Sequence, residues 1–329
     1  MTKRILVTGA AGFIGSSLCE RLVGDGHRVV GVDNLFRGRL EHLSALEQVE
    51  EFHFIEGDTR EKSVLDACGA IYGGFDLVHH LAAINGTRWF HEAARDVIDV
   101  NINTTLATLA AAERWDARYV FASSPEAFGE EELMPLKESS ASSFPSAHQH
   151  QRHSYGGSKY LGEVALQHAV ASGLDARIVR PFNAYGPRLL GDAYGQVIGM
   201  MFQAVASKQS IQVHGDGSQT RCFTHIDDVV DGFVLAGTLD DDLVENKPLA
   251  GCSFNIGSSE EVSILELADF IKTAVNDLDL SIINTEGYHG DSKRRVPDCT
   301  SAEHLLGWQC ATSLEAGLKR VWLELNVQP

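Results

Sequence analysis

The sequence lacks any run of 18 apolar residues, so it holds no segment long enough to cross a membrane as a helix. Its first residues read as a strand and lack the basic and then apolar layout of a secretory signal, so we expect a cytoplasmic protein. Cysteine is scarce, and the six residues, at positions 19, 68, 222, 252, 299 and 310, form no Cys-x-x-Cys pair. This spacing favours reduced thiols over a disulfide framework.

Basic residues are also in short supply. The chain has 27 Lys and Arg against 45 Asp and Glu, which gives a net charge of -18 without any long block of like charge. A chain this acidic repels nucleic acid and anionic membranes, so we expect neither as its main partner. An anionic small molecule would have to be held by a local cluster of arginines.

Glycine, in contrast, is placed with a regular spacing near the start of the chain. A short apolar strand at 4–8 leads into Gly9, Gly12 and Gly15, and a helical pattern follows from Phe13. Glycines at this spacing let the backbone turn and approach a pyrophosphate, and the last one lets the helix pack closely on the strand. The free N–H groups at the helix start favour phosphate, so the pattern predicts a dinucleotide site.

An acidic residue follows this glycine pattern at the expected distance. Asp33 ends a second apolar strand, 18 residues after Gly15. A carboxylate there can accept hydrogen bonds from the ribose hydroxyls and would repel a 2′-phosphate, so we expect NAD as cofactor in preference to NADP. Arg37 lies close enough to weaken that preference.

Strand-like and helix-like segments alternate up to about residue 180. This alternation predicts an α/β fold with a doubly wound parallel sheet of the Rossmann type and helices on both faces. We expect residues 1–180 to form the NAD-binding domain and residues 181–329 to form mainly a smaller, mixed α/β substrate lobe, with interleaving of the two allowed. The expected strands span 4–8, 28–33, 52–55, 76–80, 118–123 and 176–180, and later helices are expected near 263–277 and 312–325.

A tyrosine and a lysine four residues apart suggest acid–base chemistry. Tyr155 and Lys159 share one face of a predicted helix. An ammonium and a positive nicotinamide ring would both stabilise the phenolate, so Tyr155 could accept a proton from a sugar hydroxyl while the cofactor is reduced. Ser124 ends a predicted strand, where ligands bind in such sheets, and could hydrogen-bond the reacting oxygen. Glu126 lies at the same edge, as a base, a charged pocket wall or a solvated loop residue.

With these motifs together, the chain resembles the extended short-chain dehydrogenases that modify nucleotide sugars, and the resemblance covers nearly the whole chain. The motifs that carry it are TGAAGFIG at 8–15, DNL at 33–35, GD at 57–58, HLAA at 80–83, VNINTT at 100–105, SSPEAFG at 123–129, YGGSK at 155–159, RPFNAYGP at 180–187, GDGSQTRCFTHIDDVV at 215–230, FNIGS at 254–258 and RRVPD at 294–298.

This resemblance implies a homodimer that binds NAD and a nucleotide-diphosphate sugar. The implied cofactor contacts are Gly9, Gly12, Phe13, Ile14, Gly15, Asp33, Asn34, Asp58, Thr59, Leu81, Ala82, Ala83, Asn101, Tyr155 and Lys159. The implied substrate contacts are Ser124, Asn183, Arg221, Arg294 and Arg295, and the implied catalytic residues are Ser124, Glu126, Tyr155 and Lys159. Arginine forks suit a diphosphate because they bind its oxygens in pairs.

Members of this family share oxidation at C4 of the sugar and then diverge into epimerases, dehydratases and decarboxylases. The strand-end motif resembles Thr-Asp-Glu in the dehydratases and Thr-Ser-Glu in the decarboxylases, whereas here it is Ser124-Pro125-Glu126. Pro125 removes the usual elimination acid, so we favour epimerisation with internal recycling of the cofactor. Decarboxylation or dehydration through Glu126, a net oxidoreductase that releases NADH, and a non-catalytic NAD sensor or scaffold remain as alternatives.

Two departures from the family pattern stand out. Cys222 occupies a position that is usually acidic, and the segment from 139 to 154 carries His148, His150 and His153. We expect a mobile loop that covers the substrate, and His153 could supply a proton in place of the missing acid. No acidic or cysteine cluster accompanies the histidines, so no metal site is predicted.

Overall fold

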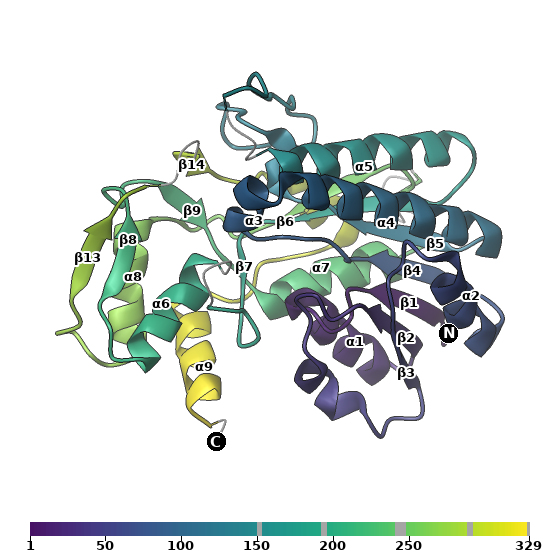
Figure 1. Cartoon of the computed structure of the whole chain (residues 1–329), viewed down its shortest axis with the longest axis horizontal. Helices are drawn as coiled ribbons and strands as arrows, with labels where there is room; N and C mark the ends of the chain where they lie inside the picture. Colours follow the sequence, from purple (N-terminus) through teal and green to yellow (C-terminus); the bar gives the residue numbers. More distant parts are fainter. Residues whose placement is uncertain (150–152, 192–195, 241–247, 288–291, 328–329) are drawn as a thin grey trace.

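The computed structural model describes residues 1–149, 153–191, 196–240, 248–287 and 292–327. A seven-stranded parallel sheet lies at its centre, in the order β11-β6-β5-β4-β1-β2-β3 (Figure 1). Its strands are β1 (Arg4–Thr8), β2 (Arg28–Asp33), β3 (Phe52–Glu56), β4 (Leu77–His80), β5 (Arg118–Ala122), β6 (Ala176–Pro181) and β11 (Ser253–Ile256). The parallel Rossmann-type sheet is therefore confirmed, and all six strands expected before residue 180 form within one residue of their predicted ends.

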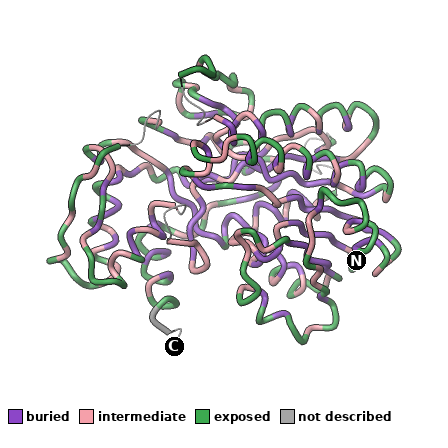
Figure 2. The backbone as a smooth tube through the Cα atoms, viewed as in Figure 1, coloured by how far each residue is buried: buried purple, intermediate pink, exposed green. Residues whose placement is uncertain are grey.

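Helices cover both faces of this sheet because its strands are apolar on both sides. In β1, Ile5 and Val7 belong to one hydrophobic cluster and Leu6 to another on the opposite face, as expected for side chains that alternate along a strand. Figure 2 shows the resulting layer of buried backbone through the middle of the molecule. The helices are α1 (Phe13–Gly24) and α7 (Ile226–Thr238) on one face, and α2 (Lys62–Tyr72), α4 (Ala94–Trp115) and α5 (Ser154–Ala171) on the other.

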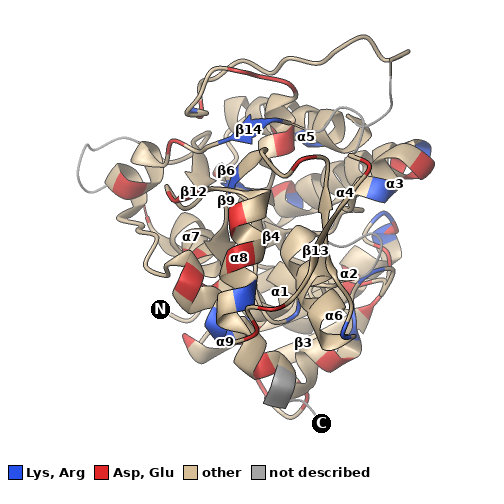
Figure 3. Cartoon of the chain, turned by 90° about the vertical axis from the view of Figure 1, so that its left-hand side faces the viewer, with Lys and Arg blue, Asp and Glu red and all other residues tan. Residues whose placement is uncertain are grey.

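A smaller mixed lobe with its own hydrophobic core lies beside the carboxyl ends of the strands (Figure 1). It contains α6 (Val197–Ala206), β8 (Ile211–His214), β9 (Thr220–Cys222), β12 (Glu261–Ser263), α8 (Ile264–Ala274), β13 (Ile282–Thr285), β14 (Arg294–Arg295) and α9 (Leu314–Val327). The two helices expected near 263–277 and 312–325 are confirmed. Strand β14 stands out as basic in Figure 3, on a face where acidic and basic residues are interspersed.

The chain passes between the two parts more than once. Strand β11 and helix α7 come from the second half of the sequence, yet β11 pairs with β6 and α7 packs under the sheet. Residues after 180 therefore complete the central sheet and its helical cover. The shorter elements are η1 (Leu40–Leu46), α3 (Thr87–Glu92), η2 (Pro125–Phe128), β7 (Ala184–Tyr185), β10 (Thr224–His225) and η3 (Ala302–Leu306).

The fold also bears on membrane-spanning helices and on the cysteine thiols. Among the described residues, no helix is both long and apolar enough to span a membrane. The six cysteines form no disulfide bond in the described part of the chain, and burial raises the pKa of the Cys68 and Cys222 thiols to about 12. These two thiols are therefore kept protonated by their apolar surroundings.

Candidate active site

A cavity of about 880 Å³ opens between the carboxyl ends of the strands and the mixed lobe. Gly9 follows β1, Leu81 follows β4 and Ser124 follows β5, and all three residues line the cavity. This is the crevice where parallel α/β sheets bind ligands, next to the point where the strand order reverses between β1 and β4. Its volume is at the upper end of the range for ligand pockets.

The glycine-rich turn forms one wall of the cavity, and its geometry requires glycine. Gly9 has φ +70°, and a Cβ there would lie 2.9 Å from the backbone nitrogen of Ala82. A Cβ on Gly15 would collide with the Gly9 carbonyl oxygen. Helix α1 starts at Phe13, and its N-cap residue, Gly12, has no side chain that could cap it. The first N–H groups of the helix are therefore directed toward the cavity. Such an arrangement fits a pyrophosphate.

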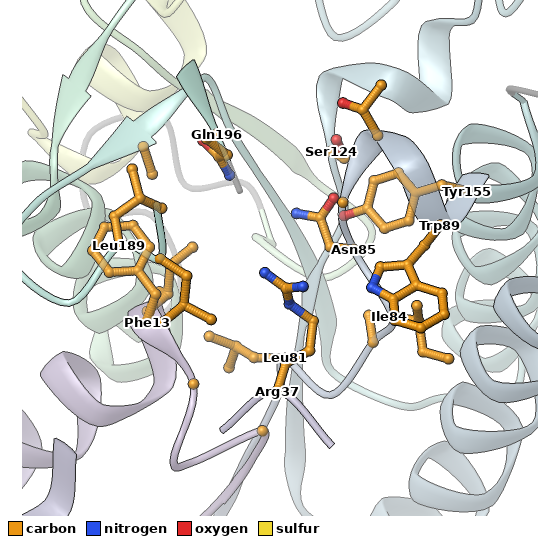
Figure 4. Close-up of a pocket in the computed structure, with 18 of the residues that line it drawn as sticks. Phe13, Arg37, Leu81, Ile84, Asn85, Trp89, Ser124, Tyr155, Leu189 and Gln196 are labelled. Atoms are coloured by element: carbon orange, nitrogen blue, oxygen red, sulfur yellow. The ribbon is translucent and has the colours of Figure 1, made fainter. Parts of the chain in front are cut away.

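Asp33 lines the same cavity at the end of β2. Its carboxylate accepts hydrogen bonds from the backbone N–H groups of Ala11 (3.0 Å) and Leu35 (2.8 Å), which fix its orientation. Burial raises the pKa of the Asp33 carboxyl, and the two N–H groups oppose that shift. Asn34 lines the cavity beside it, and Arg37 extends into the cavity in Figure 4. The preference for NAD over NADP stays a prediction.

Two further predicted contacts, Asp58 and Thr59, line the cavity beyond β3. Asp58 pairs with Arg60 at 2.7 Å, and Arg60 reaches Asp99 on α4 at 2.6 Å. The guanidinium of Arg60 lowers the pKa of the Asp58 carboxyl. Arg60 and Asp99 also line the cavity, and the sequence analysis missed both because the pairing joins two separate elements.

Polar side chains of the sheet hold the segment that follows β4. Thr8 Oγ1 accepts hydrogen bonds from the N–H groups of Leu81 (3.2 Å) and Ala82 (3.1 Å). His80 bonds the same hydroxyl at 2.8 Å. Leu81, Ala82 and Ala83 line the cavity as expected.

Asn101 is the exception among the predicted cofactor contacts, because it does not line the cavity within the described residues. It is buried on α4, where its side chain bonds the backbone N–H of Ile84 at 2.7 Å and the Ser158 hydroxyl at 3.1 Å. Asn101 therefore ties the segment after β4 to α5, and the structure gives it a supporting place behind the cavity wall.

The structure brings Ser124, Tyr155 and Lys159 together at one end of the cavity. Figure 4 shows the Tyr155 ring directed toward Ser124, with Asn85 and Trp89 near them. The Lys159 ammonium lies 5.7 Å from the centre of the Tyr155 ring and donates to the carbonyl of Ala122 at 2.7 Å. The shared helix face predicted from the four-residue spacing is thus realised.

The electrostatics of these side chains are set mainly by burial. Burial raises the pKa of the Tyr155 phenol, and a hydrogen bond with the Ser124 hydroxyl opposes the shift. Burial lowers the pKa of Lys159 to about 7, and the Glu163 carboxylate opposes that shift. Burial and the charge of Glu126 thus raise the phenol pKa in the protein alone, in contrast to the lowering expected from the sequence.

Glu126 lines the same cavity as Ser124 and Tyr155. Its Oε1 lies 3.4 Å from Nη1 of Arg295, whose side chain is buried. Arg295 also donates to the carbonyls of Pro125 (2.6 Å) and Gly129 (3.2 Å), so it fixes the turn that carries Glu126.

The predicted substrate contacts separate into two groups. Asn183 and Arg221 line the cavity, and the Asn183 amide donates to the carbonyl of Cys222 at 2.8 Å. Arg294 and Arg295 do not line it within the described residues, and Arg294 instead pairs with Glu261 at 2.7 Å on the surface. Because Arg294 is paired with Glu261 on the surface and Arg295 is engaged inside the protein, their contact with a diphosphate is a prediction that this arrangement does not favour.

Several polar residues of the cavity wall escaped the sequence analysis. Arg188 follows the RPFNAYGP motif directly, and it lines the cavity while bonding Ser16 (3.0 Å) and Glu20 (2.6 Å) on α1. The lobe side is rich in amides, contributed by Gln196, Gln203, Gln209, Gln212 and Gln219. Arg188 was recognisable from its place after the motif, whereas the glutamines are brought together only by the fold of the lobe.

The described residues of the histidine-containing segment do not line the cavity. His148 bonds Ser146 at 2.8 Å, and His153 bonds Glu130 at 3.2 Å. Neither histidine lines the cavity, so the structure gives no support to His153 as the missing acid. His150 lies outside the described residues. No group of His, Cys, Asp or Glu suited to a metal ion occurs in the described part of the chain.

Comparisons with known proteins agree with this geometry. The sequence model of the NAD dependent epimerase/dehydratase family matches residues 5–257. The chain is 33% identical to UDP-glucuronic acid decarboxylase 1 of Arabidopsis thaliana, over 97% of this chain and 68% of that protein. It is also 33% identical to UDP-glucose 4-epimerase of Mycolicibacterium smegmatis, over 96% of each. The structure of UDP-glucuronic acid 4-epimerase from Bacillus cereus, in complex with UDP-glucuronic acid and NAD, superposes with a TM-score of 0.83 at 28% identity, covering 98% of this chain and 99% of that one.

Proposed function

Because this chain belongs to the NAD-dependent epimerase/dehydratase family, we propose that it is an epimerase acting at C4 of a nucleotide-diphosphate sugar. The C4 hydroxyl is oxidised to a ketone, the ketone rotates in the cavity, and reduction from the other face gives the epimer. NAD, when bound, supplies the reversible two-electron acceptor, so the cycle needs no external oxidant. The cradle of Gly9, Gly15 and Asp33 fits this cofactor.

The convergence of Ser124, Tyr155 and Lys159 on the cavity is the observation that carries the proposal. Tyr155 accepts the proton of the C4 hydroxyl, Ser124 hydrogen-bonds the reacting oxygen, and the Lys159 ammonium stabilises the phenolate. A non-catalytic NAD sensor or scaffold is not supported, because the family is one of enzymes and a binder needs none of these three groups.

The turn after β5 favours epimerisation over dehydration. Pro125 occupies the position that an acidic residue holds in the dehydratase motif. Pro125 is buried, and its carbonyl accepts a hydrogen bond from Arg295. Its side chain has no proton to donate to a departing hydroxyl. Oxidation and return at C4 use Ser124, Tyr155 and Lys159 and need no acid at position 125.

Decarboxylation is the second candidate, and the Glu126–Arg295 contact favours it. In a hexuronic acid the carboxylate is attached to C5, the neighbour of C4, so a 4-ketone can accept the electron pair that departing carbon dioxide leaves on C5. A charged pair at the cavity wall could direct the proton that C5 takes up after the carbon dioxide has left. One of the two most similar curated relatives described above is named as a decarboxylase.

The test is product analysis by mass spectrometry and NMR after incubation with UDP-, dTDP-, GDP- and CDP-sugars. Epimerisation gives a product of unchanged mass, decarboxylation one lighter by carbon dioxide, and dehydration one lighter by water. Absorbance of NADH reports net oxidation. Deuterium at C5 of a product formed in deuterated water would overturn plain C4 epimerisation, because that reaction never breaks the C5–H bond.

We propose that Arg221 and Arg188 hold the diphosphate, since both residues line the cavity. They provide the local positive charge that a chain with net charge -18 needs in order to bind an anion. The glutamine-rich wall of the lobe offers donors and acceptors for the nucleotide base. In this proposal residues 181–329 supply mainly the substrate side of the site.

We also propose a homodimer, formed through the outer face of α4 and α5. These neighbouring helices expose large apolar side chains to solvent: Ile98, Leu106, Tyr160, Leu161 and Val164. Exposed apolar residues concentrated on two adjacent helices are typical of an interface. A two-fold axis would bring the same helix pair of each copy together in a four-helix contact. Light scattering coupled to size-exclusion chromatography tests this state.

A further inference from the structure

One buried carboxylate, that of Glu163 on α5, joins three elements behind the catalytic end of the cavity. Ser123, at the end of β5, donates its hydroxyl to Oε1 of Glu163 at 2.5 Å. Arg180 on β6 donates from Nε to Oε1 at 2.8 Å and from Nη2 to Oε2 at 2.6 Å. Ser123, Glu163 and Arg180 are exposed by only 3%, 9% and 6%, respectively.

Each of these elements also carries a residue of the site. Ser123 precedes Ser124, and Arg180 lies three residues before Asn183, which lines the cavity. Glu163 lies four residues after Lys159, so the two side chains share one face of α5.

We propose that Glu163 is a positioning residue for the oxidation step: its charge keeps Lys159 protonated, and its hydrogen bonds hold the Ser124 turn against the helix of Tyr155. The inference rests on the proposed function, because that function assigns Ser124, Tyr155 and Lys159 to the chemistry at C4.

The surroundings of Lys159 explain why it needs a nearby anion. Its ammonium is buried, and it lies 4.9 Å from the ring centre of Phe121 and 5.7 Å from that of Tyr155. An ammonium in such surroundings tends to lose its proton. Other titratable side chains lie near Lys159. Tyr155 is on the same helix. Burial holds the pKa of His80, on β4, well below its usual value, so His80 stays neutral. Glu163 is the acidic residue whose charge opposes deprotonation of Lys159.

Arg180 makes this role possible for Glu163. A buried carboxylate without a cation would take up a proton and lose its charge. The two-point contact with Arg180 gives the Glu163 carboxylate a cationic partner inside the protein, and Arg180 itself is held over the Phe128 ring, 4.6 Å from its centre. Glu163 is thereby fixed one helical turn from Lys159.

The test is the pKa of Lys159, measured by NMR titration of protein labelled with ¹³C at lysine Cε, with NAD bound. The Lys159 signal is assigned by its loss in Lys159→Arg. Glu163→Gln keeps the size of the side chain and removes its charge, so the Lys159 pKa should fall by about one unit or more. The alkaline limb of turnover should move to lower pH by the same amount, whereas a merely structural role would lower turnover at every pH.

Ser123→Ala is the matched control, because it removes the 2.5 Å hydrogen bond and leaves the charge of Glu163 in place. Its Lys159 pKa should equal that of the wild type. An unchanged Lys159 pKa in Glu163→Gln, or an equal fall in Ser123→Ala, would overturn the proposal.

If Glu163→Gln does not fold with Arg180 left unpaired, the double change Glu163→Gln/Arg180→Gln removes both charges. The Lys159 pKa should still fall, because Glu163 and not Arg180 acts on that lysine, and no fall would contradict the proposal. The titration uses no sugar. If the pKa falls while no nucleotide sugar is converted by the wild type, the proposed function fails and the role of Glu163 in charging Lys159 stands.

Discussion

Adjacent glycines in the first turn of α5 allow a sharp test of how closely the catalytic residues must fit together. A Cβ on Gly156 would collide with the carbonyl oxygen of Glu126 and lie 3.0 Å from its carbonyl carbon. A Cβ on Gly157 would meet nothing within 4 Å. Gly156→Ala and Gly157→Ala therefore make the same chemical change at neighbouring positions, and only the first pushes α5 away from the Ser124 turn.

The magnitude follows from the distances. Carbon atoms settle about 3.5–4.0 Å apart, so Gly156→Ala should displace the turn by roughly 0.5–1 Å. The backbone N–H of Glu126 donates to the Ser124 hydroxyl at 3.2 Å, so Ser124 should move with the turn. A displacement near 1 Å can cost about 10²-fold in turnover, and overpacking should lower the unfolding free energy by about 1–3 kcal/mol. Gly157→Ala should keep turnover and gain about 0.5–1 kcal/mol, because alanine favours a helix over glycine.

The assay compares turnover, NAD affinity and thermal unfolding of both variants with the wild type. NAD affinity should change little, since the glycine-rich turn and Asp33 are on other elements. The double variant Gly156→Ala/Ser124→Ala should be no slower than Ser124→Ala alone, because the displaced turn acts through Ser124. Equal turnover in Gly156→Ala and Gly157→Ala would refute the reasoning.

Three further predictions concern separate parts of the molecule. Tyr155→Phe should keep the fold and NAD binding and lose about 10²-fold or more in turnover, as expected for loss of a general base; near-normal turnover would remove Tyr155 from the chemistry. Asp33→Asn should narrow the gap between NAD and NADP affinity in calorimetric titrations, and an unchanged gap would contradict the assigned role. His79 is fully buried with no partner for either ring nitrogen among the described residues, and burial lowers its pKa from 6.5 to about 3. The unfolded chain then binds this proton at higher pH than the folded one, so stability should fall as the pH drops below 6.5, by about 2 kcal/mol from this group at pH 5. Denaturant titrations of His79→Phe at pH 7 and pH 5 should show a correspondingly smaller loss, and an equal loss would refute the assignment.

Local patterns in the sequence determined six strands of the sheet, the glycine-rich turn and the Tyr155–Lys159 helix. The apolar strands are short and bounded by turns, so their positions did not depend on distant residues. The glycines of the first turn are required by a backbone approach that lies mostly within residues 9–15. Tyr155 and Lys159 could be paired from helical spacing alone, because residues four apart on a helix share a face.

The tertiary structure decided which side chains actually face the cavity. Arg294 and Arg295 are neighbours on β14, and successive strand residues point to opposite sides. One therefore pairs with Glu261 and the other enters the protein to hold the Glu126 turn, a choice that the motif did not reveal. The phenol pKa of Tyr155 likewise depends on burial that its motif does not encode.

Contacts between elements far apart in the chain could not be predicted from local patterns. Strand β11 joins β6 from the second half of the sequence, and Glu163 meets Ser123 across 40 residues. Such pairs form because distant segments come together in the folded chain. The residues next to either partner in the sequence do not indicate what the other partner is. The sequence by itself thus determined the elements, the cofactor turn and the Tyr155–Lys159 helix, whereas packing decided which charges meet around them.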